Sequence, residues 1–132
     1  MTYGLDTSVI LRLIVDADNE HSKRVRDRIV ELRNDGDDFF ISNLAVNEAY
    51  FALQHHYGAT KAEAITALRA LAAADGFAIT AEARAALETP EVWQANPGFI
   101  DRILASEYAA KGFVTVSCEK SFRKLDLAEV IG

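Results

Sequence analysis

The stretch TYGLDTSVILRLIV, residues 2–15, joins a short apolar run at Tyr3–Leu5 to a helical pattern at Thr7–Val15. The same change of pattern recurs along the chain, with short apolar runs that predict strands and longer segments of helix-favouring residues between them. The predicted strands are Tyr3–Leu5, Phe39–Ile41, Phe77–Ile79 and Phe113–Val116, and the predicted helices are Thr7–Val15, Glu20–Arg33, Leu44–Tyr57, Lys61–Ala74, Ala81–Glu88 and Gly98–Lys111. Strands that alternate with helices predict an α/β fold with a mostly parallel central sheet between helices.

The composition is that of a folded chain without a membrane segment. Of its 132 residues, 7 are Gly and 2 are Pro, which is too few for a collagen-like or low-complexity disordered protein. No repeat and no Ser- or Gly-rich linker interrupts the chain, so we expect residues 1–132 to form a single domain. No apolar run approaches the roughly 18 residues that a membrane span requires. Cys118 is the only cysteine, which excludes an internal disulfide and fits a reducing, cytoplasmic location.

The net charge limits how this chain could bind a nucleic acid. Its 14 basic and 20 acidic residues give a formal charge of −6, so its overall field disfavours polyanions. Binding would have to use metal ions or local basic patches, for which the candidates are Arg12, Lys23, Arg24, Arg26, Arg28, Lys120, Arg123 and Lys124. A solvated helix face crossed by ion pairs is the other interpretation of the basic residues at 23–28, because Asp27 and Glu31 lie among or beside them.

Two acidic residues follow predicted strands. Asp6 comes directly after the first strand, and Glu119 stands just past the fourth. Ligands of open α/β sheets bind beyond the carboxyl ends of the strands, so both carboxylates are expected at that edge. Asp6 could also be only the N-cap of the helix that begins at Thr7, and Glu119 only a solvated loop acid.

Two further acids fall on predicted helices. Glu48 has Leu44 four residues before it and Phe51 three residues after it, which places it on an apolar face and predicts an inward-facing carboxylate. Asp101 shares a face with Leu104 in the same way, although an acid in the first turn of a helix also favours the helix dipole. Each acid alone has an ordinary structural explanation, and the set of four is what favours a shared site.

Carboxylates gathered at one edge would raise one another's pKa unless a cation neutralised them. Oxygen ligands without a Cys or His cluster select Mg²⁺ or Mn²⁺ rather than zinc. A carboxylate-held Mg²⁺ can lower the pKa of a bound water and stabilise the departing oxygen of a phosphodiester, which predicts hydrolysis of a nucleic-acid backbone. Thr7 and Ser8 are expected to support Asp6 by hydrogen bonding to it or to a metal-bound water, with helix capping as the alternative.

Four segments of the chain resemble the motifs of PIN-domain ribonucleases, and specifically those of the VapC toxins of VapBC-type toxin–antitoxin pairs. LDTSVILRL resembles the first motif with Asp6 as its acid, and ISNLAVNEAYFAL resembles the second with Glu48. GFIDRILASEYAAKG resembles the third motif with Asp101 in the matching position, and VSCEKSFRKL resembles the strand-end motif with Glu119 as its acid. The resemblance spans essentially the whole chain.

This resemblance implies a PIN-like three-layer α/β/α domain and a Mg²⁺-dependent endoribonuclease. The oxygen ligands leave Mn²⁺ as an alternative cofactor. The resemblance implies that the catalytic residues and metal ligands are Asp6, Glu48, Asp101 and Glu119. It also implies a homodimer that a cognate VapB-type antitoxin keeps inactive. The chain departs from the family pattern at Glu119, where Asp is usual, and at Gly98, where many relatives carry an additional acid.

These departures keep a second hypothesis open, in which the chain is a catalytically inactive PIN-like module that binds RNA or protein. A signalling receiver domain is a third hypothesis of similar size and architecture. It would require an acidic pair before the first helix and a Lys at the end of a late strand, and neither is evident in the sequence.

Overall fold

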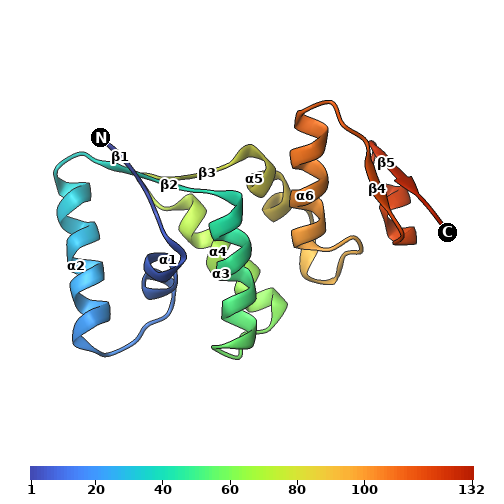
Figure 1. Ribbon diagram of the computed structural model, residues 1–132. Coiled ribbons are helices and arrows are strands. Elements are labelled where there is room, and N and C mark those ends of the chain that lie inside the picture. The colour runs from blue at the N-terminus through green and yellow to red at the C-terminus, as the bar shows by residue number, and fades with distance from the viewer. The chain divides into compact units, whose positions relative to one another are not determined.

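The computed structural model describes residues 1–132, which divide into two compact units, Met1–Thr80 and Ala81–Gly132. Each unit combines helices with parallel strands, as Figure 1 shows. None of the helices combines the length and the apolar character that crossing a membrane would take.

The first unit is built on a three-stranded parallel sheet in the order β1-β2-β3. Its strands are β1 (Thr2–Gly4), β2 (Asp38–Ile41) and β3 (Phe77–Ile79). Tyr3 is in register with Phe39, and Phe39 with Phe77, so three aromatic side chains form a row across one face of the sheet. Ring centroids are 6.3 Å apart for Tyr3 and Phe39 and 5.0 Å apart for Phe39 and Phe77, which is contact distance for aromatic pairs.

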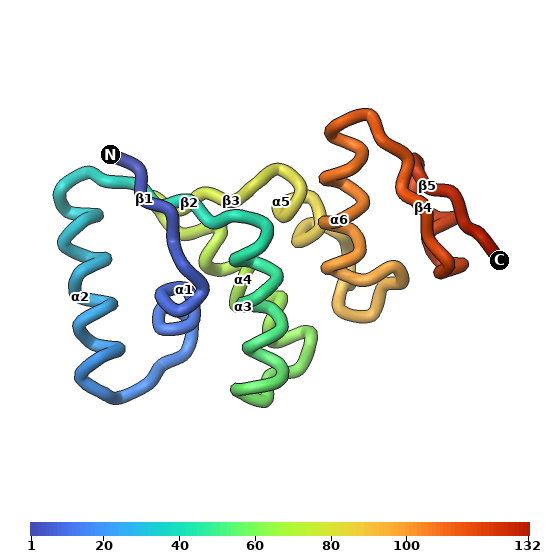
Figure 2. Tube along the Cα trace, viewed as in Figure 1, coloured from blue at the N-terminus to red at the C-terminus, as the bar shows by residue number.

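The helices of this unit are α1 (Thr7–Ile14), α2 (Glu20–Asn34), α3 (Asn43–His55) and α4 (Lys61–Ala73). The connections from β1 to β2 and from β2 to β3 step in the same direction across the sheet. Because such crossovers are right-handed, their helices lie on the same face, as Figure 2 also shows. The fully buried side chains include Ile10, Phe39, Ile41 and Ile65, which places the core between this face and the helices.

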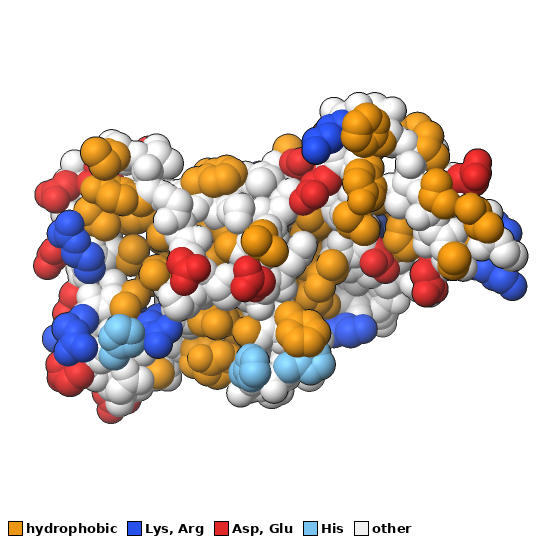
Figure 3. Space-filling model, in the orientation of Figure 1, with side chains coloured by type: hydrophobic (Ala, Val, Ile, Leu, Met, Phe, Trp, Pro, Cys, Tyr) orange, Lys and Arg blue, Asp and Glu red, His pale blue; other side chains and the backbone are white.

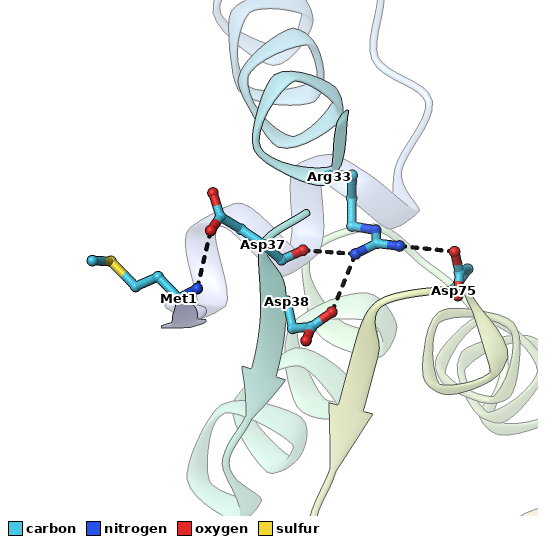
Figure 4. Close-up of polar contacts among 5 residues, drawn as sticks. All are labelled: Met1, Arg33, Asp37, Asp38 and Asp75. Atoms are coloured by element: carbon cyan, nitrogen blue, oxygen red, sulfur yellow. Dashed lines mark hydrogen bonds and ion pairs between the residues drawn. The ribbon is translucent and has the colours of Figure 1, made fainter. Parts of the chain in front are cut away.

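Arg33, at the end of α2, joins the starts of β2 and β3. Its guanidinium donates to the Asp37 carbonyl at 2.7 Å, to Asp38 Oδ1 at 3.1 Å and to Asp75 Oδ2 at 2.8 Å (Figure 4). The side chain of Arg33 is only 26% exposed, so these bonds form at the margin of the core. They fix the edge of the sheet opposite to the one at which Asp6 lies.

The second unit contains α5 (Ala81–Glu88), α6 (Phe99–Ala110) and a parallel pair of strands, β4 (Thr115–Ser117) and β5 (Ala128–Val130). Short 3₁₀ helices at Val92–Gln94 (η1) and Lys120–Lys124 (η2) complete it. Helices α5 and α6 pack against each other, and the buried side chains of this unit include Leu87, Val92, Phe99 and Ile103.

The predicted α/β class is confirmed, and every strand pairing is parallel. The predicted helices begin and end within two residues of the observed ones. Gly58, Gly76 and Gly112 have φ values of 70°, 85° and 76°, the left-handed conformation that ends a helix at little cost only for glycine. The predicted fourth strand begins two residues before β4 begins and ends one residue before β4 ends, because Phe113 and Val114 are apolar but lie exposed outside the strand.

Candidate active site

Asp6 and the start of α3 lie at the same edge of the first sheet. Asp6 follows β1 by two residues, and the Leu5 backbone N–H donates to the Phe40 carbonyl at 3.0 Å, which continues the pairing to the last residue before Asp6. Helix α3 begins two residues after β2 ends. At its start the Asn43 side-chain oxygen accepts a hydrogen bond from the hydroxyl of Thr80, the residue that follows β3. The carboxyl ends of the three strands are thus joined at one edge, where α/β sheets bind ligands.

The Asp6 carboxylate is the N-cap of α1 and is held by Ser8. Asp6 Oδ2 accepts from the Ser8 backbone N–H at 3.3 Å and from the Ser8 hydroxyl at 2.7 Å. These bonds, the hydroxyl first, lower the pKa of Asp6 from its ordinary value, because they favour the charged carboxylate. The side chain is exposed and both bonds end on one oxygen, so the carboxylate keeps lone pairs for a further ligand. Capping and ligand binding are therefore compatible roles for Asp6.

The prediction that Glu48 faces inward is wrong. Glu48 is exposed, and so are the neighbours that defined its apolar face, with Leu44 69% and Phe51 55% exposed. Helix α3 has a second apolar face, which includes Val46 and Leu53, and this is the face that the core buries. Glu48 belongs to no ion pair, so its carboxylate is accessible to a cation from solvent.

Asp101 and Glu119 belong to the second unit. Asp101 is half-buried in the first turn of α6, where a negative charge favours the helix dipole. Glu119 is exposed two residues after β4, and its backbone N–H donates to the Ser117 hydroxyl oxygen at 2.9 Å. Neither acid is in an ion pair.

Two cationic side chains fix the loop that precedes α6. Arg102 Nε donates to the Pro97 carbonyl at 2.7 Å, and Lys124 Nζ donates to the Asn96 carbonyl at 3.1 Å. The second bond connects η2, which begins directly after Glu119, to the loop that leads to Asp101. Sequence reasoning missed this role of Arg102, because no short-range pattern signals a side chain that bonds a carbonyl of a preceding loop.

The four predicted acids thus divide between the units, Asp6 and Glu48 in the first and Asp101 and Glu119 in the second. Within neither unit alone do three or more His, Cys, Asp or Glu side chains gather into a metal site. All four carry oxygen ligands that suit Mg²⁺ or Mn²⁺, and none is neutralised by a Lys or Arg. Their donor chemistry fits a hard divalent cation, and a site shared by all four stays a prediction.

Comparison with known families gives one match over almost the whole chain. The family model of the PIN domain matches residues 3–127, which include all four acids and parts of both units. The chain belongs to the PIN domain family. PIN domains are generally nucleases and generally use divalent metal ions.

Among solved structures, this PIN domain is similar to a chain of VapBC2 from Rickettsia felis, which was crystallised with a DNA fragment from their promoter. The two chains are 18% identical, the match covers 98% of each, and the TM-score is 0.43. No curated protein matches the PIN domain described here in sequence.

The basic residues at 23–28 of the PIN domain are mostly engaged by its own atoms. Lys23 pairs with Asp27 at 3.3 Å, Arg28 pairs with Glu31 at 2.9 Å, and Arg26 lies 3.4 Å from the Ala17 carbonyl oxygen. Figure 3 shows acidic and basic side chains interspersed over α2, as expected of an ion-paired helix face. Arg24 is exposed and has no partner, which leaves it as the basic residue of this segment most available to an external phosphate.

The remaining basic candidates also divide into side chains that hydrogen-bond to the protein and side chains that do not. Arg12 donates to the Ser8 carbonyl at 2.9 Å, and Lys124 donates to Asn96. Lys120 and Arg123 are exposed in η2 without a bond to the protein. Hydrogen bonding thus separates basic residues that support the fold from basic residues that are free to contact a ligand.

Proposed function

We propose that this PIN domain is a metal-dependent endoribonuclease that hydrolyses RNA phosphodiester bonds. Its metal ligands and catalytic residues are Asp6, Glu48, Asp101 and Glu119, and its cofactor is Mg²⁺, with Mn²⁺ able to replace it. The observation that carries the proposal is the Asp6 carboxylate, which Ser8 holds in its charged form at the ligand-binding edge of the sheet of a PIN domain.

A bound Mg²⁺ supplies Lewis-acid catalysis, since it acidifies water and neutralises charge that develops on the phosphodiester. The chain's own residues supply the negative charge that attracts the cation. Ser8 restricts the rotation of the Asp6 side chain through its two hydrogen bonds, so that Asp6 is oriented before a ligand arrives. Thr7 lies beside it at the first position of α1 and is assigned a supporting role in the same way.

The expected partners follow from the family resemblance of the four motifs. The substrate is RNA, which the unpaired Arg24, Lys120 and Arg123 would contact through its phosphates. The chain acts as the toxin of a VapBC-type pair, forms a homodimer, and is held inactive in the cytoplasm by a cognate VapB-type antitoxin. We also propose that residues 1–132 function as one domain, since the PIN family model matches residues 3–127.

A catalytically inactive PIN module that binds RNA or protein is the second candidate. Gly98, the N-cap of α6, favours this inactive module. Many relatives carry an acid at this position, whereas glycine has no side chain that could bond to the helix or hold a cation. Glu119 in place of Asp favours it as well, because one additional methylene changes the reach of the carboxylate.

The decisive variant is Asp6→Asn. Asparagine caps a helix about as well as aspartate, so α1 stays capped while the negative charge is lost. Full-length protein is stripped of metal with EDTA, returned to Mg²⁺, and incubated with end-labelled RNA. We expect the natural chain to cleave the RNA, Asp6→Asn to be inactive at an unchanged melting temperature, and the control Asp16→Asn, an exposed acid after α1, to be active.

Cleavage by Asp6→Asn at the rate of the natural chain would refute the assignment. Calorimetry with Mn²⁺ separates the two candidates, because the inactive module need not bind metal at these acids. Mn²⁺ binding by the natural chain that is lost in Asp6→Asn supports the nuclease.

A further inference from the structure

A cavity of about 360 Å³ lies within the second unit, between α5, α6 and the segment that leads into β5. Four of its lining residues are alanines from the two helices, Ala85, Ala86, Ala105 and Ala109. Their short side chains leave space where α5 and α6 pack against each other. The volume falls at the lower end of the range of pockets that hold small ligands, roughly 300–1,000 Å³.

One side of this cavity carries hydrogen-bond donors that the protein does not use. The half-buried Arg102 uses Nε to bond the Pro97 carbonyl, and its two terminal nitrogens have no acceptor in the chain. Ser106 lies one helical turn further along α6, lines the same cavity, and has an unpartnered hydroxyl. A half-buried guanidinium with unmet donors beside a free hydroxyl is a site for an anion with several oxygens.

A carboxylate also lines the cavity, at Asp126. Asp126 is exposed and forms no ion pair with Arg102, so the two opposite charges are not satisfied by each other. Its negative charge disfavours a ligand that is anionic throughout. The cavity therefore fits a ligand that is anionic at one end and offers hydroxyl or N–H donors at the other.

A ribonucleotide has this distribution of groups. Its phosphate accepts hydrogen bonds from a guanidinium in the geometry that arginine favours. Its ribose hydroxyls donate to a carboxylate, as in nucleotide sites where an acidic residue binds the ribose. Its base offers a flat apolar face, for which the alanines and the flanking Leu125 and Leu127 provide a surface.

We propose that this cavity binds one nucleotide of an RNA strand, with the phosphate at Arg102 and Ser106 and the ribose 2′-hydroxyl at Asp126. The choice of RNA rests on the proposed function, whereas the pocket chemistry stands on the second unit alone. Because only RNA carries the 2′-hydroxyl, Asp126 becomes a residue that distinguishes RNA from DNA.

The first test measures binding of adenosine 5′-monophosphate to the full chain in EDTA, by nuclear magnetic resonance titration. We expect saturable binding with shifts in α5 and α6, and binding of 2′-deoxyadenosine 5′-monophosphate weaker by about fivefold, the value of one lost hydrogen bond. Asp126→Ala should remove this difference and leave the binding of inorganic phosphate as tight or tighter. Equal binding of both nucleotides by the natural chain would overturn the role of Asp126.

The second test removes the anion donors. Arg102→Met should weaken nucleotide binding by at least about tenfold, whereas Arg84→Met, an exposed arginine on α5 that does not line the cavity, should not change it. If Arg102→Met fails to fold because its bond to Pro97 is lost, Ser106→Ala replaces it, since the Ser106 hydroxyl has no partner in the protein. We expect Ser106→Ala to weaken binding by about threefold.

No binding of the nucleotide by the natural chain at roughly 10 mM would overturn the proposal. Binding of acetyl-aspartate as tight as that of the nucleotide would also overturn it and point to a peptide carboxylate instead. Since EDTA removes divalent ions, these measurements do not depend on cleavage. A chain that binds the nucleotide but never cleaves RNA would refute the proposed function and support this site. A chain that cleaves RNA but does not bind the nucleotide would refute this site and support the proposed function.

Discussion

The Ser8 hydroxyl lies 2.7 Å from Asp6 Oδ2 and donates a hydrogen bond to it. This bond is the largest cause of the lowered pKa of Asp6, ahead of the bond from the Ser8 backbone N–H. A carboxylate with a lowered pKa stays charged as the solution becomes more acidic. The residue that caps α1 is thereby kept ready to attract a cation over a wider pH range.

Ser8→Ala removes the hydroxyl and should raise the pKa of Asp6 towards its ordinary value. Because Asp6 must be charged to bind a cation, the acid limb of the pH profile of kcat/KM should move to higher pH. Any stability that the charged Asp6 contributes is present above its unfolded-state pKa and is lost as the pH falls through its lower folded-state pKa. In Ser8→Ala this loss should also begin at higher pH.

The measurement is RNA cleavage across the acidic range at one fixed, subsaturating Mg²⁺ concentration, so that protonation of Asp6 lowers metal binding. Ser8→Thr is the control that keeps a hydroxyl. An acid limb that stays in place in Ser8→Ala would contradict the link between this hydrogen bond and the charge on Asp6.

Glu48→Gln should abolish cleavage without weakening the fold. Glu48 is exposed and unpaired, so its replacement should change the free energy of unfolding by less than about 0.5 kcal/mol. Loss of a metal-binding carboxylate should lower kcat/KM by at least about 100-fold. Removing a residue that only hydrogen-bonds a metal ligand typically lowers activity by about 10- to 100-fold. The matched control is Glu88→Gln, an exposed acid on α5. Equal activities of the two variants would remove Glu48 from the site.

The contrast between Asp6 and Glu48 shows what the sequence could and could not predict. The position of Asp6 followed from local rules, since a strand ends just before it and its side chain caps the next helix. The orientation of Glu48 did not, because α3 is apolar on more than one face and periodicity cannot tell which face the sheet covers. That choice depends on tertiary packing. The cavity at Arg102 and Asp126 escaped prediction for the same reason, since its lining comes from segments far apart in the sequence.

Arg33→Met should destabilise the first unit. The guanidinium joins the Asp37 carbonyl, Asp38 and Asp75 at the starts of two strands (Figure 4), and methionine replaces its aliphatic part without these bonds. We expect a loss of about 2 kcal/mol in the free energy of unfolding. Hydrogen bonds to a charged group contribute more to stability than those between neutral groups, but the contribution falls here because the partner carboxylates are exposed to solvent. Urea unfolding measures this loss, with Arg24→Met, an unpaired arginine on the same helix, as the control. Equal stabilities would mean that solvent replaces these bonds at no cost.

Gly76→Ala should destabilise the same region by about 1–3 kcal/mol, because Gly76 has a φ of 85° and an added Cβ would collide with the Arg33 side chain. Combining it with Arg33→Ala, which removes the Cδ, Nε and Cζ atoms that the added Cβ would meet, separates the two causes. The steric part disappears with the arginine side chain, so the loss in the double variant should be smaller than the sum of the single losses. Strict additivity would show that the backbone conformation alone causes the effect.

Arg24→Ala should weaken RNA binding through the phosphate backbone, and its neighbour Lys23→Ala should weaken it less. Arg24 is exposed without a partner, whereas the ammonium of Lys23 already lies 3.3 Å from Asp27. Each phosphate contact to a single strand contributes about 0.7 to the slope of log K against log salt, so the slope should fall by about this amount in Arg24→Ala. Binding is measured in Ca²⁺ with Asp6→Asn as the parent chain, so that cleavage does not interfere. A slope that falls equally in both variants would show that the Lys23–Asp27 pair opens on binding. An unchanged slope in Arg24→Ala would remove Arg24 from the RNA interface.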